Sequence, residues 1–354
     1  MQGVLHKTLI IRLSSIGDII LSSPLVRLLR GRFPDIRIDY LVKSQYADLV
    51  RHNPHISHVM EFPERGTISD LIRLRRSISS AGYDLVLDIH DSIRSRVLTA
   101  GLPATRRVNK RKLARTILVN FKQDVYSRFG GAPGVADRYL ETIQDLGIRN
   151  DQRGPEVFVP QSTRVSVDAM LAEESIDAGA SCVGICPSAK HGNKMWPADR
   201  FADAAGQLAH RTGRSVLVFG STDERNRCAE IIDLIRTAYP GVRAVSLAGR
   251  TTLLEMASAM DRCAVVVTND TGLMHLATAR GIPTVAIFGP TVRQFGFFPQ
   301  TANSIVVEQH GLSCRPCTHI GLPTCPKGHF HCMTLTTTAA VVDAALGVMA
   351  GPAS

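Results

Sequence analysis

Three segments of the chain place polar residues directly after short apolar runs, and the first contains a carboxylate. In SSIGDII (14–20), Gly17 and Asp18 follow the run LIIRL. Gly17 permits a tight turn and the close approach of another backbone. Asp18 either caps the helix that follows or faces a ligand as a general base. The spacing alone leaves both roles open.

The second segment, CPSAKHGNKMWPADRF (186–201), is a loop of small and basic residues that leads into a helix. Backbone N–H groups and a lysine ammonium in such a loop can hold a phosphate together. The candidates are Ser188 and Lys194, and the alternative is a surface loop with solvated lysines. Trp196 is expected to pack in a core rather than to stack on a ligand.

The third segment, VVVTNDTGLMHLATARGIPTVAIFGPT (265–291), contains four candidate residues at the point where an apolar run ends and a helix begins. Asp270 ends an apolar run, and Thr271 and Gly272 open the next helix. The first turn of a helix has unpaired N–H groups and the positive end of the dipole. His275 lies one turn further along the same face. This pattern favours the binding of a diphosphate.

The elements that position these segments alternate between short β-branched runs and helical patterns, which predicts an α/β fold with parallel sheets. In such sheets ligands bind beyond the carboxyl ends of the strands, where all three segments lie. The expected strands are 9–13, 36–42, 83–90, 182–188, 215–221, 264–270 and 283–290, and the expected helices include 69–79, 200–212 and 252–260.

A chain of 354 residues is long enough for two domains. The polar stretch 149–163 marks the boundary between them. We expect an N-terminal domain over 1–160 and a C-terminal domain over 161–335. We expect a final helix within 336–354, which can pack back on the first domain.

The formal charge of +10 calls for an anionic partner, which can be nucleic acid, an anionic membrane or a phosphorylated small molecule. Arg12 and Asp18 interrupt the first apolar run, so a buried strand is expected there rather than a signal peptide. No run approaches the ~20 apolar residues of a membrane span. Four scattered cysteines suit core positions in a reducing compartment, and we expect a cytoplasmic protein: Cys182, Cys186, Cys228 and Cys263.

The chain resembles glycosyltransferase family 9, the bacterial lipopolysaccharide heptosyltransferases. The resemblance is carried by S-x-G-D (15–18), K-x-W-P (194–197) and D-T-G-x-x-H (270–275), in order across nearly the whole chain. The cysteine-bearing tail is similar to the heptosyltransferase II branch. The resemblance implies a GT-B fold, two Rossmann-like domains facing each other across a cleft. It also implies inverting transfer from ADP-heptose to a lipid A-linked inner-core acceptor, with no metal or other cofactor required.

The resemblance further implies roles for single residues. Asp18 matches the proposed catalytic base, and Lys194 matches the lysine on the donor phosphates. Ser188 and Ala189 stand where some relatives have two threonines, which leaves the hydroxyl contacts of those relatives in question here. The implied donor-binding residues are Ser188, Lys194, Glu224, Thr251, Asp270, Thr271, Gly272 and His275.

A basic stretch between Asp91 and Asp124 contains no acidic residue. It is either a solvated surface or a site for an acceptor rich in carboxylates and phosphates, and it can also hold the chain against the anionic inner membrane. The expected acceptor-binding residues are Arg94, Arg96, Arg106, Arg107 and Arg111.

Four further cysteines cluster in the tail among several histidines. A C-x-x-C pair suits zinc, but the later spacings are loose, so packing or redox-sensitive thiols are expected, and a structural metal site remains the alternative. These cysteines are Cys314, Cys317, Cys325 and Cys332.

Other classes of function agree less well with the sequence. A nucleic-acid-binding protein without enzymatic activity is disfavoured by 5% aromatic residues and by the lack of a known motif. A dehydrogenase or epimerase is disfavoured because no G-x-G-x-x-G follows the first strand. A glycosyltransferase for another nucleotide sugar remains an alternative. The expected partners are the sugar donor, the lipid-linked saccharide and the membrane surface, with no nucleic acid, and the chain is taken as a monomer.

Overall fold

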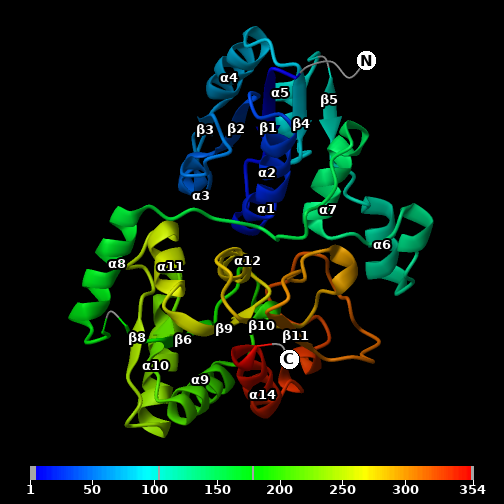
Figure 1. Cartoon of the computed structure of the whole chain (residues 1–354). Coiled ribbons are helices and arrows are strands. Elements are labelled where there is room, and N and C mark those ends of the chain that lie inside the picture. The colour runs from blue at the N-terminus through cyan, green and yellow to red at the C-terminus, as the bar shows by residue number, and fades with distance from the viewer. Residues whose placement is uncertain (1–4, 103, 178, 352–354) are drawn as a thin grey trace. The chain divides into compact units, whose positions relative to one another are not determined.

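The computed structural model describes residues 5–102, 104–177 and 179–351, which form two compact units (Figure 1). Unit 1 consists of Met1–Lys110 and Pro133–Phe158, and unit 2 of Arg111–Ala132 and Val159–Ser354. Each unit contains one parallel sheet with helices between its strands. The α/β fold expected from the sequence is therefore confirmed.

Unit 1 is built on a five-stranded sheet of order β3-β2-β1-β4-β5. Its strands are β1 (Lys7–Ile11), β2 (Arg37–Lys43), β3 (His58–Phe62), β4 (Leu85–Asp88) and β5 (Thr105–Arg107). Its helices are α1 (Ile16–Ile20), α2 (Ser23–Arg32), α3 (Asp48–Arg51), α4 (Ile68–Ser80), α5 (Ile93–Thr99) and α7 (Val135–Leu140), with the 3-10 turns η1 (Ser44–Tyr46) and η3 (Glu141–Leu146).

The centre of this sheet is a pair of strands at which the strand order reverses. The chain adds β2 and β3 on one side of β1 and then returns to add β4 on the other side. β1 and β4 pair in parallel, with Ile11 opposite Asp88. Ligands of open α/β sheets bind at such a reversal, so the residues that follow β1 and β4 are the first candidates for a site in unit 1.

Unit 2 is built on a six-stranded sheet of order β11-β10-β9-β6-β7-β8. Its strands are β6 (Cys182–Cys186), β7 (Val216–Val218), β8 (Ala244–Ser246), β9 (Cys263–Asn269), β10 (Thr284–Phe288) and β11 (Ser304–Glu308). Its helices are α6 (Lys112–Phe121), α8 (Gln161–Glu173), α9 (Ala198–Thr212), α10 (Arg225–Ala238), α11 (Leu253–Met260), α12 (Gly272–Ala279), α13 (His331–Thr334) and α14 (Thr338–Ala350), with the 3-10 turns η2 (Tyr126–Phe129), η4 (Gly192–Lys194), η5 (Thr222–Glu224) and η6 (Arg293–Phe295).

The reversal of strand order in unit 2 lies between β6 and β9. Both strands are almost fully buried, as expected for the central strands of a parallel sheet. The second and third segments identified in the sequence follow these two strands directly. The fold therefore brings Ser188, Lys194 and Asp270 to the same end of one sheet.

Two boundaries differ from those expected. Segment 111–132, expected in the N-terminal domain, belongs to unit 2, because Ala114, Leu118 and Tyr126 pack with Phe295 in one apolar cluster. The final helix α14 also belongs to unit 2, where it packs on α9 and on the strands β9, β10 and β11. The terminal residues 1–4 and 352–354, which the expected domains include, lie outside the described residues.

Candidate functional site

The site in unit 2 is centred on an ion pair at the strand reversal. Lys194 Nζ lies 2.6 Å from Asp270 Oδ2, and Thr291 Oγ1 donates a hydrogen bond to the same oxygen at 2.7 Å. The two charged side chains are only 13% and 8% exposed. An ammonium held at the carboxyl ends of two central strands is a candidate for anion binding.

The loop that carries Lys194 is anchored on both sides. Asn193 is buried, and its Oδ1 accepts a hydrogen bond from the backbone N–H of Leu322 at 2.8 Å. Only glycine fits at position 192, because a Cβ on Gly192 would lie 2.2 Å from the carbonyl oxygen of Pro323. On the other side the backbone N–H of Trp196 donates to Asn269 Oδ1 at 3.0 Å. These contacts fix the position of the lysine.

Two further groups of the expected donor site lie at the same sheet end. Thr271 is the N-cap of α12, and its hydroxyl accepts from the backbone N–H of Leu273 at 3.2 Å. Ser188 Oγ is buried and has no hydrogen-bond partner among the residues described. A buried hydroxyl without a partner calls for an explanation, and a ligand at this sheet end supplies one. His275 is 3% exposed and packs beside Phe297.

Glu224 and Thr251 follow strands β7 and β8 on the same side of β6. Glu224 caps η5, since its Oε2 accepts the backbone N–H of Ser221 at 2.7 Å. Thr251 Oγ1 donates to the carbonyl of Leu247 at 3.5 Å. In the described part of the chain, neither residue shares a hydrogen bond or ion pair with Lys194. Their role in donor binding stays a prediction.

The site in unit 1 is centred on Asp18, in the first turn of α1 after β1. Asp18 Oδ1 accepts from Arg12 Nη2 at 2.6 Å and from the Tyr139 hydroxyl at 3.2 Å. Its Oδ2 accepts from the hydroxyl and the backbone N–H of Ser15, at 3.0 and 3.4 Å. The contact with Ser15 is the helix cap considered from the sequence, and it does not conflict with a role in catalysis.

Arg12 determines the charge state of Asp18. Burial opposes the ionised form, but the Arg12 guanidinium and the hydrogen bonds from Ser15 outweigh it and lower the pKa of Asp18. The Arg12 side chain is itself only 9% exposed, and its Nη1 donates to the carbonyl of Ile89 at 2.7 Å. Arg12 therefore joins the end of β1 to the end of β4.

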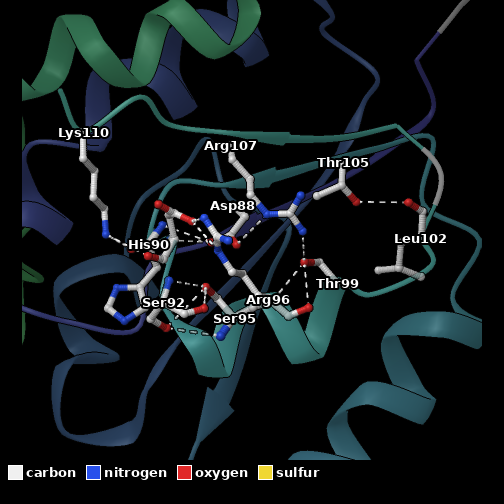
Figure 2. Close-up of polar contacts among 11 residues, drawn as sticks. Asp88, His90, Ser92, Ser95, Arg96, Thr99, Leu102, Thr105, Arg107 and Lys110 are labelled. Carbon is white, nitrogen blue, oxygen red and sulfur yellow. Dashed lines mark hydrogen bonds and ion pairs between the residues drawn. The ribbon is translucent and has the colours of Figure 1, made fainter. Parts of the chain in front are cut away.

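Most of the arginines expected to bind the acceptor have acidic or aromatic neighbours within unit 1. Arg96 pairs with Asp91 at 2.7 Å, and Arg107 lies 3.6 Å from Asp88 and donates to the hydroxyl of Thr99 at 2.8 Å (Figure 2). These acids precede the basic stretch in sequence and partly neutralise it.

The other three arginines expected to bind the acceptor are Arg94, Arg106 and Arg111. Arg106 forms two hydrogen bonds with Asp145, at 2.6 and 2.8 Å. Arg94 lies over the ring of Phe62 and is exposed. Arg111 belongs to unit 2 rather than to the expected first domain, and it is the N-cap residue of α6.

The site residues expected from the sequence do not include four residues that the structure places at these sheet ends: Arg12, His90, Lys110 and Thr291. His90 and Lys110 follow β4 and β5, and Lys110 Nζ donates to the backbone carbonyl of His90 at 2.5 Å (Figure 2). A signal was present for Arg12 and His90, because both are polar residues at the carboxyl end of an expected strand. Thr291 is identified as part of this group only by the hydrogen bond that its hydroxyl donates to Asp270.

The tail cysteines Cys314, Cys317, Cys325 and Cys332 are free thiols. Burial, and next the neighbouring cysteines, raise the pKa of Cys332 to about 11, and burial likewise raises the pKa of Cys317. Within the described residues, no group of three or more His, Cys, Asp or Glu side chains is arranged to hold a metal ion. Likewise, no helix in residues 5–102, 104–177 or 179–351 is long and apolar enough to cross a membrane.

Comparison with known proteins gives consistent matches. The model of glycosyltransferase family 9 (heptosyltransferase) matches residues 71–326. The lipopolysaccharide heptosyltransferase 2 of Escherichia coli (strain K12) is 30% identical over 300 residues, which cover 82% of this chain and 84% of that protein.

Two solved structures show the same fold at low identity. The glycosyl transferase family 9 protein of Veillonella parvula DSM 2008 superimposes with a TM-score of 0.81 and 22% identity, covering 99% of each chain. The E. coli ADP-heptose LPS heptosyltransferase II superimposes with a TM-score of 0.74 and 23% identity, covering 97% of this chain and 98% of that one. These matches confirm the GT-B class of fold.

Proposed function

This chain belongs to glycosyltransferase family 9 and is a glycosyltransferase; from that premise we propose that it transfers a heptose from ADP-heptose to the lipid A-linked inner core of lipopolysaccharide. The observation that carries the proposal is that Lys194 and the N-terminus of α12 lie at the strand reversal of unit 2, where they can form an anion site. The names of the similar proteins, lipopolysaccharide heptosyltransferase 2 and ADP-heptose LPS heptosyltransferase II, support this donor and this acceptor.

The transfer requires a base on the acceptor and positive charge on the leaving group. Asp18 takes the proton of the acceptor hydroxyl as the oxygen forms its bond to the anomeric carbon of the sugar. The bond from that carbon to the diphosphate breaks, and ADP leaves with the bonding electrons. A single displacement of this kind inverts the anomeric configuration. The position of Asp18 after β1, beside the strand reversal of unit 1, supports this role.

Stabilisation of the leaving diphosphate falls to unit 2. The ammonium of Lys194 and the amide groups at the start of α12 provide positive charge where negative charge develops. The hydroxyls of Ser188 and Thr271 and the imidazole of His275 complete the proposed donor site. Because these groups supply the charge, we propose that turnover has no requirement for a divalent ion.

The direct test is turnover of ADP-heptose with a lipid A-linked inner-core saccharide. We expect ADP release coupled to acceptor glycosylation, an inverted anomeric centre in the product by NMR, and unchanged turnover in excess chelator. UDP- and GDP-sugars serve as competitors that test the alternative donor. Turnover of one of these and not of ADP-heptose would refute the donor assignment. Salt-sensitive retention on DNA without sugar transfer would support the nucleic-acid alternative instead.

Peripheral contact with an anionic inner membrane is also part of the proposal, and the surface of α6 supports it. Leu113 and Phe121 are 59% and 69% exposed, next to the exposed basic residues Lys112 and Lys122. Exposed apolar side chains beside lysines suit a surface of anionic lipid. We expect cosedimentation with phosphatidylglycerol vesicles and none with phosphatidylcholine vesicles. Leu113→Asp with Phe121→Asp should abolish it.

A further inference from the structure

His90 occupies a position in unit 1 that the proposed mechanism has not used. It follows β4, across the strand reversal from the end of β1 where Asp18 is found. Its backbone is fixed by three contacts: its N–H donates to Asp88 Oδ1 at 3.2 Å, its carbonyl accepts from Lys110, and the preceding carbonyl of Ile89 accepts from Arg12. The residue is therefore held firmly at the end of the sheet where ligands bind.

The imidazole itself forms no such contacts. Its Nδ1 is buried without a partner, whereas Nε2 remains accessible and has no hydrogen bond in the described part of the chain. Figure 2 shows the ring beside the hydrogen-bonded network of Asp88, Arg96 and Arg107 rather than within it. A histidine kept only for packing normally satisfies its polar atoms. One that does not do so is a candidate for ligand contact.

The charges that surround His90 determine its protonation state. Burial, followed by the positive charges of Arg12 and Lys110, lowers the pKa of His90 to about 4, with Arg94 acting in the same direction and Asp18 against it. At neutral pH the ring is therefore uncharged and carries one N–H donor and one lone pair. A neutral group of this kind suits a sugar hydroxyl, which both donates and accepts.

Asp18 alone is poorly suited to orienting the acceptor. Its two oxygens already accept from Arg12, Tyr139 and twice from Ser15, and a carboxylate has about four lone-pair positions. An incoming hydroxyl must compete with these donors for Asp18. A second group that holds the hydroxyl in place removes that difficulty, and the accessible nitrogen of His90 lies at the same strand reversal.

We propose that His90 contacts the acceptor saccharide through Nε2 and positions the hydroxyl that reacts. This inference rests on the proposed function for the identity of the acceptor. It assigns to the chain a substrate-contacting residue at the end of β4 in addition to the base after β1. The proton still passes to Asp18, so His90 stays neutral throughout the transfer.

Three substitutions separate contact through Nε2 from a packing role. The side-chain amide of His90→Gln reaches about as far as Nε2, whereas that of His90→Asn reaches only as far as Nδ1, and His90→Ala removes both. We expect His90→Asn and His90→Ala to raise the acceptor KM about 10-fold, as for the loss of one hydrogen bond. His90→Gln should stay within about threefold of the wild type. The dissociation constant for ADP should be unchanged in all three.

Calorimetric titration of the same variants with a deacylated lipid A-linked inner-core saccharide, without donor, keeps this inference separate from the proposed function. If the wild type binds the saccharide but does not turn over ADP-heptose, the proposed donor fails while the role of His90 is still measured. Saccharide binding by folded His90→Asn and His90→Ala that equals that of the wild type would overturn the proposal. Equal losses of saccharide affinity in His90→Gln and His90→Ala would overturn the proposal as well, because the contact would then not depend on a group at the Nε2 position.

Discussion

Both charged side chains that the proposed transfer requires are held in short ion pairs. Asp18 lies 2.6 Å from Arg12, and Lys194 lies 2.6 Å from Asp270. Each pair fixes a flexible side chain in one place before the substrates bind, which reduces the entropy that binding must overcome. Each pair also keeps the buried charge compensated, because an isolated ion at these exposures is strongly destabilising.

The role of Asp18 is tested by Asp18→Asn, which preserves shape and removes the base. We expect turnover to fall at least ~100-fold, with the dissociation constant for ADP nearly unchanged because the donor groups lie in unit 2. Asp48→Asn is a matched control, since Asp48 is 58% exposed and far from the strand reversal in sequence. Near-normal turnover by a folded Asp18→Asn protein would exclude Asp18 as the base.

The role of Lys194 is tested by Lys194→Ala. A charge-assisted contact to phosphate contributes roughly 1.5–3 kcal/mol, so ADP binding measured by calorimetry should weaken by about 10- to 150-fold. Turnover should fall further, because charge on the diphosphate grows in the transition state. Lys190→Ala is the control, because Lys190 lies in the same loop and is exposed. Equal ADP affinities of Lys194→Ala and Lys190→Ala would contradict the assignment.

At the scale of elements, the informative segment is 111–132, which leaves unit 1 to pack on unit 2. Lys122 Nζ donates to the carbonyl of Pro316 at 2.6 Å, and Gln294 donates to Asp124 at 2.9 Å. Leu118 and Phe295, which belong to one apolar cluster, lie within a few residues of Lys122 and Gln294 in the sequence. The segment is thus held by residues about 170 to 194 positions further along the chain.

The cluster predicts a large effect of Leu118→Ala. Leu118 is 6% exposed, so its truncation should lower the free energy of unfolding by about 2–5 kcal/mol and speed proteolysis within 111–132. Leu113→Ala, in the same helix but 59% exposed, should change it by no more than about 0.5 kcal/mol. Denaturant unfolding followed by circular dichroism measures both. Equal effects would mean that α6 is not anchored through this cluster.

The tail contains four free cysteines: Cys314, Cys317 and Cys325 lie in the long loop between β11 and α13, and Cys332 lies in α13. Metal ligation requires thiolates, but burial and the neighbouring thiols raise the pKa of Cys317 and Cys332. We therefore expect far less than one zinc per chain by elemental analysis and no change in thermal stability with chelator. Stoichiometric zinc together with unfolding on chelation would show that the loop is a structural metal site.

At the scale of the whole molecule, each unit contains one strand reversal and one charged site. The chain crosses between the units at 110–111, 132–133 and 158–159, so no single cut separates them. The net charge of +10 is not spread as free positive charge, because several of the arginines in the basic stretch pair with acids of unit 1.

A ligand that binds only the folded chain raises its stability by mass action. At 100 times its dissociation constant, ADP should stabilise the fold by about 2.7 kcal/mol, visible as an increase in the midpoint of thermal unfolding. UDP, GDP and NAD should produce smaller increases at the same concentration. The Lys194→Ala protein serves as the control, since its response to ADP should be reduced. A larger response to NAD or UDP would identify a different nucleotide.

The α/β class, the central strands and the two polar segments after β6 and β9 could be predicted from the sequence alone. This was possible because a buried parallel strand is a continuous apolar run and a ligand-binding residue at its carboxyl end interrupts that run. The strands that the sequence did not reveal are β3, β5, β8 and β11, the edges of both sheets. Edge strands are covered on fewer sides, so they need fewer apolar residues, as the partly exposed β3 and β11 illustrate.

Which charged side chains form ion pairs depends on the tertiary structure. The pairs Lys194–Asp270 and Arg106–Asp145 join residues 76 and 39 positions apart, and no local pattern records such a contact. The same holds for segment 111–132, which precedes the domain boundary expected at 149–163 but whose apolar residues pack in unit 2. The periodicity of apolar residues shows which face of a helix or strand is buried. Which surface that face contacts depends on how elements that are distant in the sequence pack together.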